Sequence, residues 1–184
     1  SIMTALAGAE RIFEIMDTPD EIDEGTLDVE VSRIQGNIEF KNIQFGYVPE
    51  EPVLKGLNLS VKKGQRIAIV GATGSGKTTV VNLLTRFHEL DSGKIYVDNM
   101  DITELPKKTL RDSIAIVLQD TVLFADTIRA NIRYGNPDAT EEEIRFAAKT
   151  AKADKFIERL PDGYDTVLTE GGRNLSQGQR QLLA

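Results

Sequence analysis

One stretch of the chain has residue types and spacing suited to phosphate chemistry: residues 71–78, GATGSGKT, match the pattern G-x-x-x-x-G-K-S/T. The stretch follows the apolar run 67–70 and opens a helix-like pattern, which is the context the motif requires. Its glycines let backbone N–H groups surround an anion, aided by the positive end of the helix. Lys77 can lie along the β- and γ-phosphates, and the Thr78 hydroxyl can ligate a bridging Mg²⁺. The motif predicts a nucleoside triphosphate site.

Tyr47 is a candidate platform for the base of that nucleotide. It ends a short β-like run among turn residues, and stacking of a base on an aromatic ring contributes about 1–3 kcal/mol. An aromatic residue on a strand is also typical of a protein core, so that alternative stays open. The string Asn-Lys-x-Asp, with which GTPases read guanine, does not occur in the sequence. Adenine is therefore the favoured base.

Two further positions have polar residues suited to a metal or a phosphate. Gln119 and Asp120 follow the apolar run 114–118. Asp120 could support Mg²⁺ at the end of a buried strand, or Gln119 could be a polar ligand and switch; spacing slightly favours Asp120. Residues 175–181 read LSQGQRQ. A Ser followed by a Gly at a helix start offers a hydroxyl and free N–H groups to an anion.

The hydrophobic pattern predicts the elements that position these residues. Apolar residues at spacings of three and four over 1–16 indicate an amphipathic helix, and the acidic stretch to about residue 30 indicates a solvated connector. Continuous apolar runs at 67–70 and 114–118 predict buried strands of an α/β fold. Short β-like runs predict an antiparallel piece at residues 38–40, 43–47, 57–61 and 95–100.

Helices are expected between about residues 122 and 161. Thr140 followed by Glu143 forms a capping-box pattern at the start of one of them. The stretch 161–163, Pro-Asp-Gly, ends the helical pattern. An α/β domain with helices inserted late in the chain is the predicted organisation.

Composition excludes several classes of protein. The 184 residues include 22 Lys and Arg against 29 Asp and Glu, a net charge of −7, which disfavours a large nucleic-acid surface. There is no Cys, so disulfides, thiolate metal sites and Cys nucleophiles are excluded. The longest apolar runs are far shorter than the roughly 18–20 residues of a membrane span.

Together these motifs resemble the nucleotide-binding domain of an ATP-binding cassette (ABC) transporter, above all exporters with fused membrane and nucleotide domains. The similarity covers essentially the whole chain, with the motifs in the family's order and spacing. The matching segments are the aromatic loop at 45–47, the Walker A loop at 71–79, the Q-loop at 117–120, the pattern facing the membrane domain at 123–132 and the signature, usually LSGGQ, at 175–179. Residues 9–17 are similar to the segment that joins the last transmembrane helix to this domain.

The resemblance implies a P-loop NTPase fold: a RecA-like parallel sheet core, an antiparallel β subdomain and an inserted helical subdomain at about 122–175. Residues 1–30 would be a linker helix and connector from a preceding transmembrane domain, and 31–184 the N-terminal portion of the nucleotide-binding domain. The implied place is the cytoplasmic face of the cell membrane. The implied partners are a second nucleotide-binding domain, identical or related, and the transmembrane domain of the same polypeptide, with no nucleic acid.

The resemblance also assigns site residues, with ATP and Mg²⁺ as the ligands. It favours Gln119 over Asp120, as a Mg²⁺ ligand beside Thr78. Lys77, Gln119, Ser176 and Gly178 are implied to act in catalysis, the last two on the nucleotide of a head-to-tail partner. The residues implied to contact nucleotide are Tyr47, Gly71, Thr73, Gly74, Ser75, Gly76, Lys77, Thr78, Thr79, Ser176, Gln177, Gly178 and Gln179.

The sequence departs from the family pattern in two ways. Gln177 stands where the family usually has Gly, and we expect the signature to function with altered packing. The Walker B Asp, the catalytic Glu and the switch His of the family do not occur within the 184 residues, and the single histidine, His88, is expected to be a surface residue. The parallel core is therefore expected to be incomplete, and these 184 residues alone to bind nucleotide weakly and hydrolyse nothing.

Three functions remain as alternatives. The first is the ATPase motor of an ABC exporter. The second is a non-catalytic, ATP-binding regulatory half of an asymmetric ABC pair. The third is an unrelated P-loop kinase or GTPase, for which the signature at 175–179 would have no role in turnover.

Overall fold

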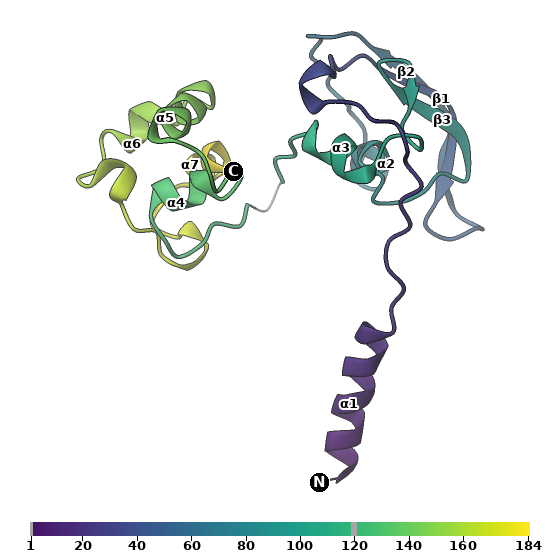
Figure 1. Cartoon of the computed structure of the whole chain (residues 1–184), viewed down its shortest axis with the longest axis horizontal. Helices are drawn as coiled ribbons and strands as arrows, with labels where there is room; N and C mark the ends of the chain where they lie inside the picture. The colour runs from purple at the N-terminus through teal and green to yellow at the C-terminus, as the bar shows by residue number, and fades with distance from the viewer. Residues whose placement is uncertain (1, 119–120) are drawn as a thin grey trace. The chain divides into compact units, whose positions relative to one another are not determined.

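The computed structural model describes residues 2–118 and 121–184, which divide after Ala115 into two units. Figure 1 labels the α-helices and the strands β1, β2 and β3. The first unit contains α1 (Ile2–Met16), η1 (Val31–Arg33), β1 (Ile38–Gly46), β2 (Pro52–Val61), α2 (Lys77–Leu84), β3 (Ser92–Val97), β4 (Met100–Asp101) and α3 (Lys107–Asp112). The second contains α4 (Ile128–Arg133), α5 (Glu141–Thr150), α6 (Asp154–Ile157), η2 (Gly163–Asp165), η3 (Glu170–Gly172) and α7 (Gln177–Leu183).

An antiparallel sheet with the strand order β2-β1-β3-β4 forms the framework of the first unit. Ile38 of β1 lies opposite Val61 of β2 on one side and Val97 of β3 on the other. Asp98 and Asn99 join β3 to β4, and both have positive φ (49° and 66°), as a two-residue type I′ turn requires. The expected antiparallel strands are confirmed, as is the helix predicted over residues 1–16.

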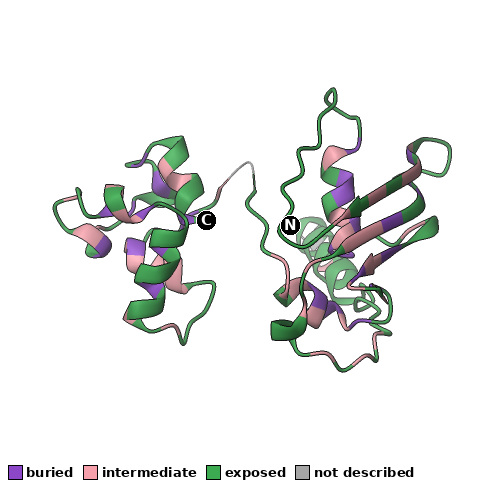
Figure 2. Ribbon diagram, turned by 90° about the horizontal axis from the view of Figure 1, so that it is seen from above, coloured by how far each residue is buried: buried purple, intermediate pink, exposed green. Residues whose placement is uncertain are grey.

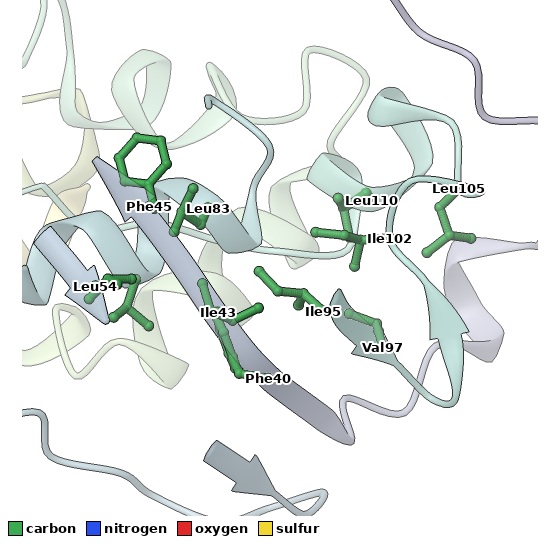
Figure 3. Close-up of a cluster of buried hydrophobic side chains, with 11 residues drawn as sticks. Phe40, Ile43, Phe45, Leu54, Leu83, Ile95, Val97, Ile102, Leu105 and Leu110 are labelled. Carbon is green, nitrogen blue, oxygen red and sulfur yellow. The ribbon is translucent and has the colours of Figure 1, made fainter. Parts of the chain in front are cut away.

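Apolar side chains from the sheet and two helices form the core of the first unit (Figure 3). Phe40 and Ile43 of β1 and Ile95 of β3 are buried in it. Leu83 of α2 and Leu110 of α3 belong to the same cluster and are 1% and 0% exposed. The core therefore fixes α2, the helix that begins within the phosphate-binding motif, to the antiparallel sheet.

Residues 67–70 and 114–118, predicted to be buried strands, are not strands in this structure. Val70 is 87% exposed, and Val117 and Leu118 are also exposed. Parallel strands are stable when neighbours pair with them and helices cover both faces. Within residues 2–118 and 121–184, no segment forms a ladder with either run. The strand prediction is wrong here because an apolar run becomes a strand only when pairing partners are present.

Short helices packed around one apolar cluster form the second unit, as expected for residues 122–161 (Figure 2). Thr140 and Glu143 form the predicted capping box at the start of α5. None of the described helices is long and apolar enough to cross a membrane. The fully buried side chains of the cluster include Ile128, Ile144, Ile157 and Leu168.

Residues 21–27 of the connector are mostly exposed, as expected, and they are also tied to the first unit by hydrogen bonds. Glu21 accepts hydrogen bonds from both terminal nitrogens of Arg111 at 2.7 and 2.8 Å, and from Lys107 Nζ at 3.0 Å. Two backbone N–H groups further along the segment donate to the carbonyl oxygen of Glu104. The connector is thus joined to α3 and to the chain just before it.

We expect Glu21→Gln to lower the thermal unfolding midpoint at pH 7. Hydrogen bonds from Arg111 and Lys107 lower the pKa of Glu21 from 4.5 to about 2. A carboxyl with a depressed pKa stabilises the folded state above its unfolded-state pKa and loses that effect as pH falls through the folded value. The difference between the wild type and the variant should therefore shrink as pH falls from about 4.5 toward 2, which thermal melts at several pH values measure.

Lys108→Ala is the control for this prediction. Lys108 pairs with Asp112 on the exposed side of the same helix, α3, and an exposed pair of this kind contributes little. The Lys108 variant should melt near the wild type at pH 7. A Glu21→Gln effect that stayed constant down to pH 2.5 would contradict the ion-pair explanation.

Candidate nucleotide-binding site

The N-terminus of α2 is shaped to bind an anion. Gly76 is its N-cap residue, with φ at 86°, and the helix start has no side-chain cap. The first N–H groups of a helix have no intrahelical acceptor, and the helix dipole adds positive potential there. Gly74 also has a positive φ, 82°. This backbone fits the triphosphate that the sequence predicts.

Lys77 lies across the loop that precedes α2. Its Nζ donates hydrogen bonds to the carbonyl oxygens of Gly71 at 2.9 Å and Ala72 at 2.7 Å. A Cβ on residue 71 would clash with the hydroxyl of Ser75, so any other side chain there would force Ser75 to move. Thr73 and Ser75 are both exposed in the loop. In the structure this ammonium group donates only to neutral carbonyl oxygens. It can therefore exchange them for the oxygens of a phosphate, which carry a negative charge.

The two threonines after Lys77 differ in their surroundings. Thr78 is exposed in the first turn of α2, where its hydroxyl is free to meet a cation. Thr79 is 4% exposed, and its Oγ1 shares a hydrogen bond of 3.1 Å with Tyr47 Oη. Across residues 2–118 and 121–184, no group of three His, Asp or Glu side chains is placed to hold a metal ion. Gln119, the other expected Mg²⁺ ligand, and Asp120 lie outside the described residues.

Tyr47 has the properties of a base platform. The residue is 54% exposed, which is not the burial of a core residue. Its hydroxyl is anchored to Thr79, and Phe45 packs against it edge to face, with ring centroids 5.0 Å apart. An aromatic ring that is held in place with an open face can stack on a base. The phosphate loop and Tyr47 are thus brought together within the first unit.

The predicted signature lies in the second unit, at the start of α7. Ser176 is the N-cap: its Oγ accepts from the N–H of Gln179 at 3.2 Å, and Gln179 Oε1 accepts from the N–H of Ser176 at 2.9 Å. Leu175 is buried and anchors the segment. A Cβ added to Gly178 would meet no atom within 4 Å, so this side of the helix start is open. Gln177 is exposed.

The geometry agrees with comparisons to known proteins. A model of the ABC transporter family matches residues 54–184. The chain belongs to this family. The structure of a bacterial Atm1-family ABC exporter with ATP bound superposes with a TM-score of 0.78 at 38% identity, over 99% of this chain and 33% of that one.

Curated relatives of this ABC transporter chain are similar over its whole length. It is 50% identical to an uncharacterized ABC transporter ATP-binding protein, YfiC, of Bacillus subtilis, covering 30% of that protein. It is 43% identical to a fatty acid ABC transporter ATP-binding/permease protein of Mycobacterium tuberculosis, covering 29%, and 47% identical to an ATP-dependent lipid A-core flippase of Desulfotalea psychrophila, covering 32%. The chain thus spans about a third or less of the length of each of these relatives.

Two contacts of this ABC transporter chain were not predicted from the sequence. One is the hydrogen bond between Thr79 and Tyr47. The sequence predicted only a contact with nucleotide for each of these two residues. The other is the approach of β2 to the loop: a Cβ on Gly76 would lie 3.0 Å from side-chain carbons of Val53 and Leu54. Both join residues more than 20 positions apart, which no local pattern signals.

We expect Gly76→Ala to destabilise the first unit more than Gly74→Ala. Both variants place an L residue at positive φ, which costs about 1 kcal/mol. The added methyl group meets nothing within 4 Å at position 74, whereas at 76 it lies 3.0 Å from side-chain carbons of Val53 and Leu54 on β2, which must shift to make room. Urea unfolding of the two variants measures the difference. Equal losses would show that β2 does not constrain the loop.

Proposed function

We propose that this chain is the ATP-binding part of an ABC exporter, which couples binding and hydrolysis of Mg-ATP to export of a substrate across a membrane. One observation carries the proposal: an anion-binding helix start and an exposed aromatic platform are joined in one unit by the hydrogen bond between Thr79 and Tyr47. Such a site recognises a base and a phosphate chain in the same ligand. Relatives named as a permease and as a flippase support transport.

Each group at the site has a defined task in this proposal. The N–H groups at the start of α2 and the ammonium of Lys77 bind the phosphates, and Tyr47 stacks on adenine. Thr78, with Gln119, holds the cation. Bound Mg²⁺ supplies charge that neutralises the phosphates. The protein's own groups thereby fix the direction of the phosphate chain before any reaction.

The proposed partner is a second nucleotide-binding domain, related head to tail. Ser176 and Gly178 would contact the nucleotide of that partner, since they combine a hydroxyl, free helix N–H groups and an open helix face. The second proposed partner is the transmembrane domain of the same polypeptide, to which residues 1–30 would connect this domain. The domain would then act on the cytoplasmic face of the cell membrane.

A second candidate is a non-catalytic ATP-binding half of an asymmetric pair, and the departure from the family pattern at Gln177 is the observation that raises it. The family usually has glycine at this position. The Gln177 side chain lines a cavity of about 630 Å³ together with Arg173 and Arg180. Steady-state ATPase measurements on the full-length protein separate the two candidates. The exporter motor hydrolyses ATP at the site completed by its signature, whereas the non-catalytic half binds ATP there without turnover.

We expect Ser176→Ala to abolish most ATP turnover by the full-length protein. Loss of the cap itself costs about 1 kcal/mol of stability. Thr140→Ala is a matched control, because Thr140 caps α5 in the same unit with the same capping-box geometry. Both variants should lose similar stability, but only the Ser176 variant should lose turnover. Equal turnover in the two variants would refute a role for the signature and favour an unrelated P-loop enzyme.

The 184-residue chain alone should bind Mg-ATP weakly and hydrolyse none. Residues 67–70 and 116–118 are exposed and form no strands in the structure, so the ends from which parallel strands would present catalytic groups are not assembled. Calorimetric titration with Mg-ATP and a phosphate-release assay test this, with Lys77→Ala as the control that removes binding. Turnover by the purified 184-residue chain would overturn the expectation.

A further inference from the structure

His88, which the sequence predicted to be a surface residue, contacts the base platform. Its ring packs against Tyr47 with centroids 5.1 Å apart and the planes at 90°, and against Phe45 at 5.7 Å. Perpendicular aromatic pairs at such distances are favourable beyond the area they bury. His88 is otherwise an exposed residue. Tyr47 is therefore held by rings from two segments.

The C-terminus of α2 directs His88 toward Tyr47. The N–H of Phe87 bonds to the carbonyl oxygen of Asn82 and the N–H of Arg86 to that of Leu83, which is the Schellman arrangement. Arg86 takes the left-handed position usually occupied by glycine, with φ at 54°. Its guanidinium donates to the carbonyl oxygen of Ile102 at 3.3 Å, which holds the turn in place. These hydrogen bonds fix the turn by which the chain reverses direction after α2.

The loop that follows His88 is tied to the strand that carries the platform. Asp91 Oδ2 accepts from the N–H of Gly46 at 2.8 Å, and the N–H of Asp91 donates to the carbonyl oxygen of Gln44 at 3.2 Å. Gly46 ends β1, directly before Tyr47. Residues 88–91 therefore fix both the backbone before Tyr47 and its ring.

We propose that His88 is a positioning residue for the base: it orients Tyr47, so that α2 controls the base subsite as well as the phosphate subsite. Two residues near opposite ends of α2 contact Tyr47: Thr79, near the start of the helix, and His88, just past its end. A ring held from both ends presents a fixed face to the purine, and preorganisation of this kind strengthens binding. This inference rests on the proposed ATP site.

The test compares a ligand with a base and a ligand without one. Affinities of the full-length protein for Mg-ATP and for inorganic tripolyphosphate are measured by calorimetry for the wild type, His88→Ala and His88→Phe, each also in a Tyr47→Ala background. His88→Ala should weaken Mg-ATP binding about two- to tenfold, the range of one aromatic pair, and leave tripolyphosphate unchanged. His88→Phe should restore the affinity for Mg-ATP. In the Tyr47→Ala background, His88→Ala should have no further effect.

Other results overturn the inference. An unchanged affinity for Mg-ATP in His88→Ala, an equal loss for both ligands, or the same loss in the Tyr47→Ala background would each show that His88 does not act through the platform. Lys77→Ala separates this failure from failure of the proposed function. If Lys77→Ala weakens neither ligand, the phosphate site itself is refuted; if it weakens both while His88→Ala has no effect, only the role of His88 falls.

Discussion

The packing of α2 against the antiparallel sheet is the interaction on which the site depends. α2 has eight residues, and isolated helices shorter than about 12–15 residues are marginal in water. Its direction is therefore set by burial of Val80 and Leu83, not by helix propensity. The same packing leaves Thr78 and the loop before it at the surface. A substitution that alters the core of the first unit would therefore also shift α2 and the phosphate loop that precedes it.

Charged groups satisfy the other end of α2. Arg111 donates to the carbonyl oxygens of Thr85 and Arg86 at 3.0 and 2.8 Å, where the last carbonyl groups of a helix lack intrahelical partners. A cation at this end also complements the helix dipole. The same guanidinium binds Glu21 with two hydrogen bonds. The connector therefore reaches the C-terminal end of the phosphate-loop helix through Arg111, and Asp23 adds an ion pair with Arg86 at 4.0 Å.

Local signals in the sequence predicted local structure well. The capping box at Thr140 depends on residues three positions apart, and the antiparallel strands were predicted from short local runs; the structure confirms both. The pairing of Glu21 with Arg111 spans 90 positions, and that of Tyr47 with Thr79 spans 32, so no periodic pattern encodes them. The strand prediction at 67–70 failed for a related reason. An apolar run shows what a segment can bury, not whether a partner strand is there to pair with it.

The departure at Gln177 leaves in place the atoms of the signature that we propose bind an anion. The Ser176 hydroxyl accepts a hydrogen bond from the N–H of Gln179, and a hydroxyl that accepts can still donate its own proton. Gly178 keeps an open face where a Cβ would meet nothing. Gln177 adds its side chain to a cavity lined also by Arg180, within the second unit. Since the donor and the open face belong to the two neighbouring residues, the substitution changes the wall of that cavity while retaining the groups that a phosphate would contact.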